Sequence, residues 1–484
     1  MTDKPRGNDA ARSPITATIK SGALPIVGLQ LQEGKKIPRG QVVAWAFWDW
    51  GGAAFNSVIT TFVFTVYITS SFFIAPTLRA AELAEKNPNG PAHLAAVAAE
   101  APLSSGLAFG LGIAGLIVAL IAPVLGQRSD ASGRRKLWLA VNTGVVVLMM
   151  ALMFFVQGQP TYFYFGVTLV AIGTVFFEIA TVNYNAMLIQ VSTPKTVGKV
   201  SGLGWGAGYF GGIVLLLFVL LGLVGLTASS GGFFGVSHDN GLNIRIIALI
   251  SAAWTVVFSI PIFLKVPEIP NERRRDRVGF FQSYVVLFRD VATLWRESRN
   301  TVWFLIASAL FRDGLVGVFT FGGILAAGTF GFSETQVIIF AIAANVVAGV
   351  STWISGLFDD RFGAKPVIVV SLIGLIIAGT GVFFAHSLGQ GAFWVGGLIL
   401  CLFVGPAQSA SRTFLARVTP AGREGEVFGL YATTGRCVSF LAPTLFGVLV
   451  SIFGAQYWGI LGIVVVLLAG LLFLLPVKAS VKTS

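Results

Sequence analysis

Six ionisable side chains interrupt long apolar stretches of this sequence, and they are the strongest candidates for chemistry. They comprise three acids and three bases: Asp49, Glu178, Arg312, Asp313, Arg412 and Arg436. Charges in such surroundings are costly and by default indicate a binding site or a proton relay. Acids there can exchange protons, and arginines can bind an anionic group. Two alternatives remain open, because the six can form a structural network of neutralising pairs and Arg412 can simply extend to a polar boundary.

Motifs for other chemistries are weak. The three histidines fall in or near predicted loops without the spacing of metal ligands: His93, His238 and His386. The sequence has no phosphate-binding Gly-x-x-x-x-Gly-Lys-[Ser/Thr] loop and no nucleophile elbow. Gly206, Gly208 and Gly211 match a dinucleotide fingerprint, but no strand precedes them, so close helix packing is the better interpretation. We therefore expect no metal, no cofactor and no enzyme activity.

The elements that must position the six charges are membrane helices. The chain is 55% apolar and 11% charged, whereas a soluble domain is about a quarter charged. A transmembrane helix needs roughly 20 mostly apolar residues. Twelve segments qualify, which predicts an all-α polytopic membrane protein with twelve transmembrane helices: 42–72, 105–126, 137–157, 161–188, 200–226, 243–264, 301–327, 334–357, 366–386, 391–416, 427–453 and 455–476.

Basic residues are concentrated in alternate loops of this map. With the N-terminus placed inside, the outer loops carry only Arg79 and Lys86. Apart from Arg245 and the three arginines named above, all the others of the 33 Lys and Arg fall in inner loops and tails. Lys and Arg are enriched in cytoplasmic loops, so we expect a multi-pass protein of the cell inner membrane with both termini in the cytoplasm. The net charge of +12 follows from this bias rather than from nucleic-acid binding.

The map divides the chain into five parts. We expect a disordered cytoplasmic tail at 1–40, an N-terminal half of six helices at 41–264, a cytoplasmic linker at 265–300, a C-terminal half at 301–477 and a short tail at 478–484. In the linker, apolar residues recur at helical spacing from Phe280 to Trp295, while Arg289 and Asp290 take other positions. This pattern predicts an amphipathic helix at the inner interface; a partly buried linker is the equal alternative.

Two inner loops repeat one motif at matching places in the two halves, and we interpret them as gating loops. The first contains Gly126, Asp130, Gly133, Arg134 and Arg135, and the second contains Gly356, Asp360, Gly363 and Lys365. A second pair of similar stretches, Thr193–Leu203 and Thr419–Leu430, precedes the fifth and eleventh helices. Glycines allow tight turns between helices, and an aspartate can accept from free amides at a helix N-terminus. The repeat implies two halves in parallel orientation.

The two loops resemble the major facilitator signature between helices two and three and its echo between helices eight and nine. Further stretches, spread over nearly the whole membrane region, resemble one branch, the "unknown major facilitator" family. That branch includes fungal vacuolar amino-acid effluxers linked to autophagy. The stretches are Trp45–Trp50, Val200–Gly212, Arg312–Leu315, Phe321–Gly323, Gln408–Arg412 and Gly429–Tyr431.

The resemblance implies a secondary transporter that moves a small solute by alternating access. It suggests an amino acid or related metabolite, export as the direction, protons as the coupling ion, and a monomer in contact with membrane lipids. Helices 1, 4, 7 and 10 line the cavity of that fold. Trp50 and Gln408 therefore join the six charges as candidate substrate- and ion-coupling residues, although a tryptophan can equally face the lipid. A receptor or scaffold that keeps the fold without transport is the alternative.

Two contacts follow from this resemblance. Asp360 should lie near the backbone amides of Gly198–Ser201, and Asp130 near those of Gly425–Phe428, when the inner side is closed. Arg312 and Asp313 point about 100° apart on a helix. We expect Asp313 to pair with Arg436 or Arg412, which leaves Arg312 for Glu178, Asp49 or an anionic substrate group.

Overall fold

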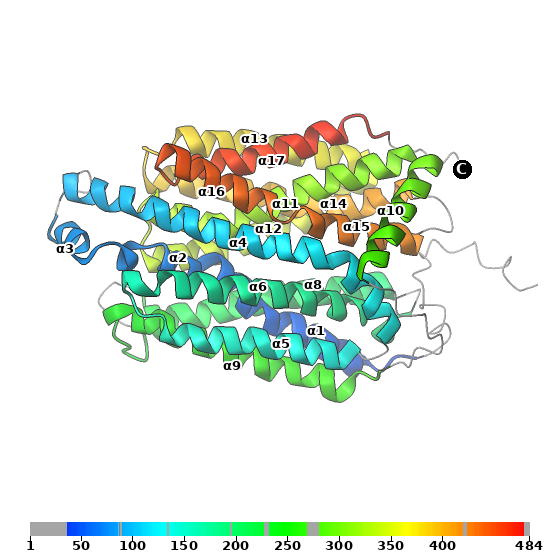
Figure 1. Ribbon diagram of the computed structural model, residues 1–484, viewed down its shortest axis with the longest axis horizontal. Coiled ribbons are helices and arrows are strands. Elements are labelled where there is room, and N and C mark those ends of the chain that lie inside the picture. Colours follow the sequence, from blue (N-terminus) through cyan, green and yellow to red (C-terminus); the bar gives the residue numbers. More distant parts are fainter. Residues whose placement is uncertain are drawn as a thin grey trace, which may run out of the picture.

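The computed structural model describes residues 36–478 except 86, 88–89, 133–134, 194–195, 227–231, 269–279 and 420–423. Within the helices, the side chains at 122–123, 125–132, 189, 197–199, 280, 360 and 424–426 also lie outside the description. The long helices run along the long axis of the molecule, and both ends of the described chain lie at the same end of the bundle (Figure 1). We call this end the terminus side and the opposite end the far side.

Twelve helical spans cross the bundle, as the sequence predicts. Eleven spans in the described chain are long and apolar enough to cross a membrane, and α17 (Trp458–Leu474, 17 residues) is the twelfth, at the short end of the range for a bilayer. The others are α1 (Arg39–Ala53) with a π-helix (Ala54–Phe62) and α2 (Phe64–Ile68), α4 (Pro91–Ser132), α5 (Arg135–Leu152), α6 (Phe163–Ala186), α8 (Val197–Val219), α9 (Leu242–Lys265), α11 (Arg299–Gly328), α12 (Glu334–Phe362), α13 (Ala364–Phe384), α14 (Gln390–Val418), and α15 (Glu424–Cys437) with α16 (Leu441–Phe453).

The region 73–104, expected to be a long loop, is mostly helical. It contains α3 (Pro76–Ala84) and the first turns of α4. Alanine is the best helix former and is frequent after Pro91, which suits the first position of a helix. At 1.5 Å per residue α4 is about 60 Å long, twice the hydrocarbon core of a bilayer. Its far-side end and α3 project beyond the other helices (Figure 1).

Three spans are irregular where the sequence predicts continuous α-helix, and the fifth of the twelve ends in a π-helix (Leu220–Val224) after α8. The first span contains the π-helix, where the Asn56 carbonyl accepts from the hydroxyls of Thr60 at 2.8 Å and Thr61 at 2.7 Å. The eleventh span is interrupted between Cys437 and Leu441. Such departures occur often at functional sites. Apolarity alone cannot predict them, because they change the hydrogen bonding and not the composition of the segment.

The spans pack as two groups, with α1–α9 on one side of the bundle and α11–α17 on the other (Figure 1). A long contact between the groups is made by α4 against α15 and α16. A Cβ atom added at Gly115 would lie 2.7 Å from the Ser439 carbonyl oxygen, and one at Gly447 would lie 3.3 Å from the Ser105 carbonyl oxygen. Glycines thus let the backbones approach directly across this interface.

Hydrogen bonds also join the two groups at the far side. Each uses a side chain at or near the far-side end of a helix. The bonds are Asn243 Nδ2 to Glu334 Oε2 at 3.0 Å, Thr335 Oγ1 to the Gly225 carbonyl at 3.0 Å, and Gln456 Nε2 to Ser104 Oγ at 2.9 Å. The far side is therefore closed between the two groups.

The glycine-rich part of α8 packs against the first span. An added Cβ would lie 2.7 Å from the Trp45 ring at Gly204, 2.5 Å from the Trp50 carbonyl oxygen at Gly211, and 2.8 Å from Ser57 Oγ at Gly212. These distances are shorter than a Cβ tolerates, so the glycines permit the contact. Gly204, Gly211 and Gly212 thus act in helix packing, as predicted for this run, whereas an added Cβ at Gly206 would meet nothing within 4 Å.

The linker contains the predicted helix, α10 (Phe280–Glu297). It contacts both α4 and α11. Leu294 is fully buried and the Tyr284 hydroxyl donates to the Leu120 carbonyl, whereas Phe281 is 83% exposed and Phe288 is 69% exposed. One face of α10 thus packs on the bundle and another apolar face is exposed, and its place at the inner interface stays a prediction.

Candidate functional site

The predicted charges lie deep within their helices. At 1.5 Å per residue, Asp49, Arg312 and Arg436 are about 15–20 Å from the terminus-side ends of their helices, close to the middle of a hydrocarbon core of about 30 Å. Glu178 and Arg412 are nearer the terminus side by the same measure. Asp49, Arg312 and Arg436 therefore lie near the middle of the bundle, with Glu178 and Arg412 between them and the terminus side.

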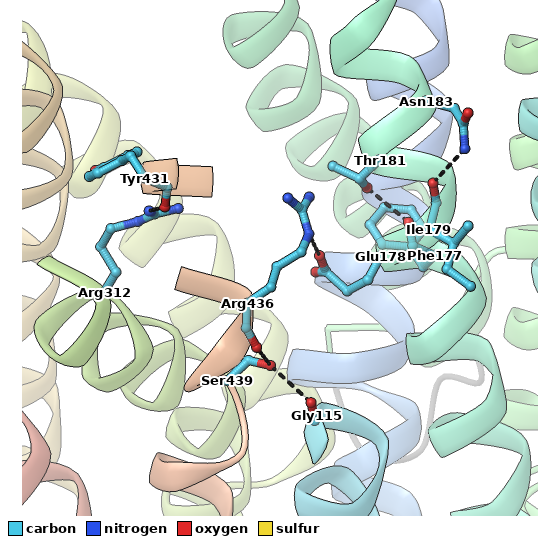
Figure 2. A network of polar contacts seen from close by, with 10 residues as sticks. All are labelled: Gly115, Phe177, Glu178, Ile179, Thr181, Asn183, Arg312, Tyr431, Arg436 and Ser439. Atoms are coloured by element: carbon cyan, nitrogen blue, oxygen red, sulfur yellow. Dashed lines mark hydrogen bonds and ion pairs between the residues drawn. The ribbon is translucent and has the colours of Figure 1, made fainter. Parts of the chain in front are cut away.

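Glu178 and Arg436 form an ion pair between the two groups of helices. Arg436 Nε on α15 lies 3.3 Å from Glu178 Oε2 on α6, and the two side chains approach each other across the space between their helices (Figure 2). The Arg436 side chain is 17% exposed and that of Glu178 is 40% exposed. This contact lies on the interface that must change if the two groups move apart.

Arg312 is held by the aromatic residue Tyr431. Its Nη1 donates to the Tyr431 carbonyl at 3.1 Å, and its guanidinium carbon lies 4.1 Å from the centroid of that residue's ring. Figure 2 shows Arg312 and Arg436 on separate helices, with different partners. Gly435 makes room for this arrangement, since an added Cβ would lie 2.8 Å from Arg312 Nη1. No carboxylate among the described residues forms an ion pair with Arg312.

Asp313 does not pair with either predicted arginine. Its Oδ2 accepts from the backbone N–H of Ala442 at 2.7 Å, and the residue is 5% exposed. Ala442 stands in the first turn of α16, where backbone amides lack helical partners and the helix dipole favours a negative charge. The interruption of the eleventh span creates this helix start. The predicted pairing was wrong because it assumed a continuous helix through this span, although Pro443, a residue suited to the first turn of a helix, marks the start of α16.

Arg412 reaches across to the other group of helices. Its guanidinium lies 4.4 Å from the ring centroid of Trp205 on α8, in the geometry of a cation–π contact. The Arg412 side chain therefore contacts Trp205 inside the bundle instead of extending to a polar boundary. Gln408 stands one turn away on α14, on the same face, and is half-buried. Like Arg312, Arg412 has no ion-pair partner among the described carboxylates.

Asp49 is an acid without a hydrogen bond or ion pair to any other described residue. It faces α8, where an added Cβ at Gly208 would lie 3.3 Å from the carboxyl carbon. Tyr209, the next residue of α8, interacts electrostatically with both Asp49 and Arg412. Tyr209 thus lies within electrostatic range of Asp49 in one group of helices and of Arg412 in the other.

The tryptophans beside Asp49 serve mainly in packing. Trp45 and Trp48 are each 2% exposed and stack on Tyr184, with ring centroids 4.4 Å apart in both pairs. Trp50 points elsewhere, toward Phe258 on α9 with ring centroids 5.9 Å apart. Trp50 therefore lies against α9 rather than beside the arginines, and Trp45 and Trp48 fit neither a cavity lining nor a lipid-facing belt.

The gating loops are only partly described. Gly133 and Arg134, and the side chains at Gly126, Asp130 and Asp360, lie outside the described residues. The two predicted aspartate contacts therefore stay predictions. Arg135 Nη1 donates to the Ala186 carbonyl at 3.0 Å.

The second loop shows more of its contacts. Lys365 Nζ donates to the carbonyls of Leu475 at 2.9 Å and Val477 at 2.6 Å. Gly363 has φ +88°, which favours glycine, while an added Cβ at Gly356 would meet open space. Beside the predicted Asp360, Asp359 forms an ion pair with Arg417 at 3.0 Å. Arg135 and Lys365 thus each bind a helix end within their own half.

Three aromatic residues of the site were not predicted from the sequence: Trp205, Tyr209 and Tyr431. Trp205 and Tyr209 are four residues apart, which places them on one face of α8. That spacing is the available signal, but aromatic residues are so common in membrane helices that it does not distinguish a site from a packing surface.

Comparisons with known proteins agree with this arrangement. A family described as "Vacuole effluxer Atg22 like" matches residues 38–483. The uncharacterized MFS-type transporter YxiO of Bacillus subtilis is 24% identical over 444 residues, covering 91% of this chain and 95% of the relative. Autophagy-related protein 22 of Cryptococcus neoformans is 25% identical over 317 residues, covering 60% of this chain and 56% of that protein. The chain thus spans little more than half the length of this fungal relative.

Solved structures show the same fold. The crystal structure of a D-xylose–proton symporter aligns with a TM-score of 0.61 at 15% identity, covering 91% of this chain and 97% of the other. That of the nucleoside transporter NupG aligns with a TM-score of 0.55 at 15% identity, covering 90% of this chain and 96% of the other. The protein is therefore a multi-pass membrane transporter of the major facilitator superfamily and not an enzyme. Within that superfamily it belongs to the Atg22-like family.

Proposed function

We propose that the protein moves a small zwitterionic solute, of the amino-acid class, by alternating access between its two groups of helices. One observation carries this proposal. Arg312 and Arg412 lie within electrostatic range of each other and rest on aromatic rings, with no carboxylate paired to either among the described residues. Asp49 likewise has no described ion-pair partner.

Unpaired charges at mid-depth call for a ligand of opposite charge. Two arginines that rest on aromatic rings keep most of their N–H donors for a carboxylate, which arginine binds in a bidentate manner. Asp49 would accept from an ammonium group. A solute that carries both groups would satisfy the two arginines and the acid at once, whereas a neutral sugar would leave these charges unpaired.

The Glu178–Arg436 ion pair supplies a means of coupling. In our proposal it breaks when the two groups of helices move apart, and the freed Glu178 exchanges a proton with the open side. Asp49 is the second candidate proton carrier. Asp313 is assigned a structural role in this scheme, because its carboxylate caps α16. A monomer suffices, since all the proposed site residues come from one chain.

The direction and location are proposed from two sources. The Lys and Arg bias of the loops favours the terminus side as cytoplasmic, in the inner membrane of the cell. The family description names effluxers, which supports export across the far side. The gating loops would then close the cytoplasmic side during the far-side-open half of the cycle.

Counterflow in proteoliposomes tests the proposed solute. We expect exchange of a radiolabelled neutral amino acid, with neither its decarboxylated amine nor its deaminated acid able to compete. Arg312→Gln and Arg412→Gln should each weaken uptake by at least about tenfold, since each removes a charged partner of the solute (about 1.4 kcal/mol or more). Arg289→Gln, at an exposed arginine on α10, is the matched control. Exchange of neither zwitterions nor other small solutes would favour a receptor or scaffold instead.

A further inference from the structure

A polar cavity lies near the far side of the bundle, away from the charges at mid-depth. It is a chamber of about 190 Å³ between the two groups of helices, whereas a single water needs only about 10–15 Å³. The end of the first span, from Phe62 to Phe72, lines one side together with Glu100 of α4. The end of α11 and the start of α12, including Glu334, line the other side.

Each group of helices contributes one carboxylate to this chamber. Glu100 is 8% exposed and lies beside the Ser71 backbone N–H. Glu334 Oε2 accepts from Asn243 Nδ2 at 3.0 Å. An ionised carboxylate has about four acceptor positions, so these neutral donors leave both groups able to accept more. Their charge is not compensated by the donors.

Of the basic residues nearby, Arg79 and Arg245 are engaged outside the chamber, while His238 lies within electrostatic range of Glu334. Among the described residues that line it, none is Lys, Arg or His. The Arg79 guanidinium lies 4.0 Å from the centroid of the Phe72 ring. Arg245 Nε donates to the Phe154 carbonyl. The chamber therefore holds two carboxyl groups and no basic side chain in its described lining, in a partly desolvated space where an unpaired ionised carboxylate is costly.

A further acceptor stands at the edge of the chamber. Gln456 is 3% exposed, and its Nε2 donates to Ser104. Its Oε1 has no hydrogen-bond partner among the described groups and lies against Gly328, one of the chamber-lining residues. A buried amide oxygen without a donor costs about 1–3 kcal/mol, so a ligand with N–H groups or a hydrated cation at this place would satisfy it.

We propose that this chamber, with Glu100 and Glu334 from opposite groups of helices, is a second binding site that takes a small monovalent cation. The cation is either the ammonium group of a solute in transit or an alkali ion. The first source rests on the proposed function; the second does not. Because the two carboxylates belong to different groups of helices, a cation between them would also hold the far side closed, and its departure would favour opening.

Thermal unfolding of the purified full-length protein in lipid nanodiscs tests the site without any transport measurement. Methylammonium chloride and sodium chloride serve as probes, against N-methyl-D-glucamine chloride at equal ionic strength as a cation too bulky for the chamber. We expect one of the two small cations at saturating concentration to raise Tm by about 2 °C or more. Stabilisation by methylammonium alone identifies an ammonium site, and stabilisation by sodium identifies an alkali-ion site.

Variants then locate the effect. Glu100→Gln and Glu334→Gln should each reduce the shift, and the double variant should abolish it. Glu85→Gln is the matched control, because Glu85 lies on the same side, accepts from the Asn87 backbone N–H at 3.2 Å and does not line the chamber. A shift that persists in the double variant, or no shift with either cation, overturns the proposal.

A second measurement covers variants that fail to fold. In the wild-type protein, the bound cation should slow modification of Glu100 and Glu334 by a water-soluble carbodiimide, read by mass spectrometry, while Glu85 reacts equally with and without the cation. Equal modification of all three overturns the proposal. The amino-acid counterflow assay is independent of both measurements, so a failed chamber and a failed transport proposal are distinguishable.

Discussion

At the scale of single residues, the partner of each buried charge determines what that charge is free to do. The Glu178–Arg436 pair joins the two groups of helices, so it must break and reform if they move. Asp313 and Arg312 are adjacent in sequence yet bind separate parts of the eleventh span, Ala442 and Tyr431. Arg412 and Arg312 keep guanidinium N–H groups for a ligand. The partners of the charged residues therefore distinguish an ion pair that must break during movement, a carboxylate that caps a helix, and arginines whose N–H donors are still available.

Asp313→Leu should destabilise the protein by removing the acceptor that caps α16. The loss leaves the Ala442 N–H without its partner, at a cost of about 1–3 kcal/mol, and we expect a matching fall in the thermal unfolding midpoint. Asp313→Asn retains an oxygen acceptor and should lose less. A second neutralisation, at Arg436 or Arg412, should not restore stability. Rescue by either would show that Asp313 is an ion-pair partner after all.

A double-mutant cycle on Glu178 and Arg436 should give a coupling energy for transport on the order of 0.5–3 kcal/mol. Glu178→Gln and Arg436→Gln each leave an opposite charge without its partner near mid-depth, whereas the double variant does not. We therefore expect uptake to fall more in each single variant than independent effects predict. The reversed pair, Glu178→Arg with Arg436→Glu, should recover part of the activity. Additive effects on uptake and expression would assign no joint role to the pair.

At the scale of elements, small residues decide how closely helices approach, and helix interruptions decide where backbone groups become available. Gly115 on α4 meets the backbone of the eleventh span at Ser439, within the interruption between α15 and α16. The Ser439 hydroxyl in turn lies 3.4 Å from the Gly115 carbonyl oxygen. The same interruption exposes the amide that Asp313 binds. The contact between the two groups of helices and the cap of α16 thus depend on one irregular segment.

Gly115→Val should disrupt this contact. Its Cβ would lie 2.7 Å from the Ser439 carbonyl oxygen, with backbone atoms on the other side of the contact that cannot rotate away. Overpacking of this kind costs about 1–3 kcal/mol, and we expect lower thermal stability together with loss of transport. Gly144→Ala on α5 is the control: an added Cβ meets nothing within 4 Å, and alanine is the better helix former. Equal effects of the two substitutions would contradict the proposed role of the glycine.

The sequence predicts the elements of this fold well and the partners within it poorly. Long apolar stretches decide the number of spans, and the repeated loops with Asp130 and Asp360 point to two halves, because both signals are local in the chain. The pairing of Asp313 depends on an interruption between Cys437 and Leu441, which leaves no mark on hydropathy. Glu100 escapes notice in the sequence because it stands in an alanine-rich stretch that hydropathy assigns to a loop. Contacts between residues hundreds of positions apart follow from the packing of whole helices.

At the scale of the whole molecule, the described contacts define a state in which the far side is closed. The hydrogen bonds at Glu334, Thr335 and Gln456 all join the two groups of helices there. A far-side chamber lies beneath these contacts, and the candidate solute site lies farther along the same axis, at mid-depth. Transport through this path requires the three hydrogen bonds to break together, because they belong to one interface between two packed bodies.

Cross-linking across that interface should therefore stop transport. In a background lacking Cys401 and Cys437, Ser104→Cys with Gln456→Cys places two thiols where a hydrogen bond of 2.9 Å now joins the groups of helices. A short bifunctional methanethiosulfonate should abolish uptake, and dithiothreitol should restore it. Gln336→Cys with Gln390→Cys is the matched control, since that hydrogen bond, also 2.9 Å, lies within one group. Its cross-link should leave uptake nearly unchanged. If both cross-links inhibit equally, rigid-body separation at the far side is not the step that limits transport.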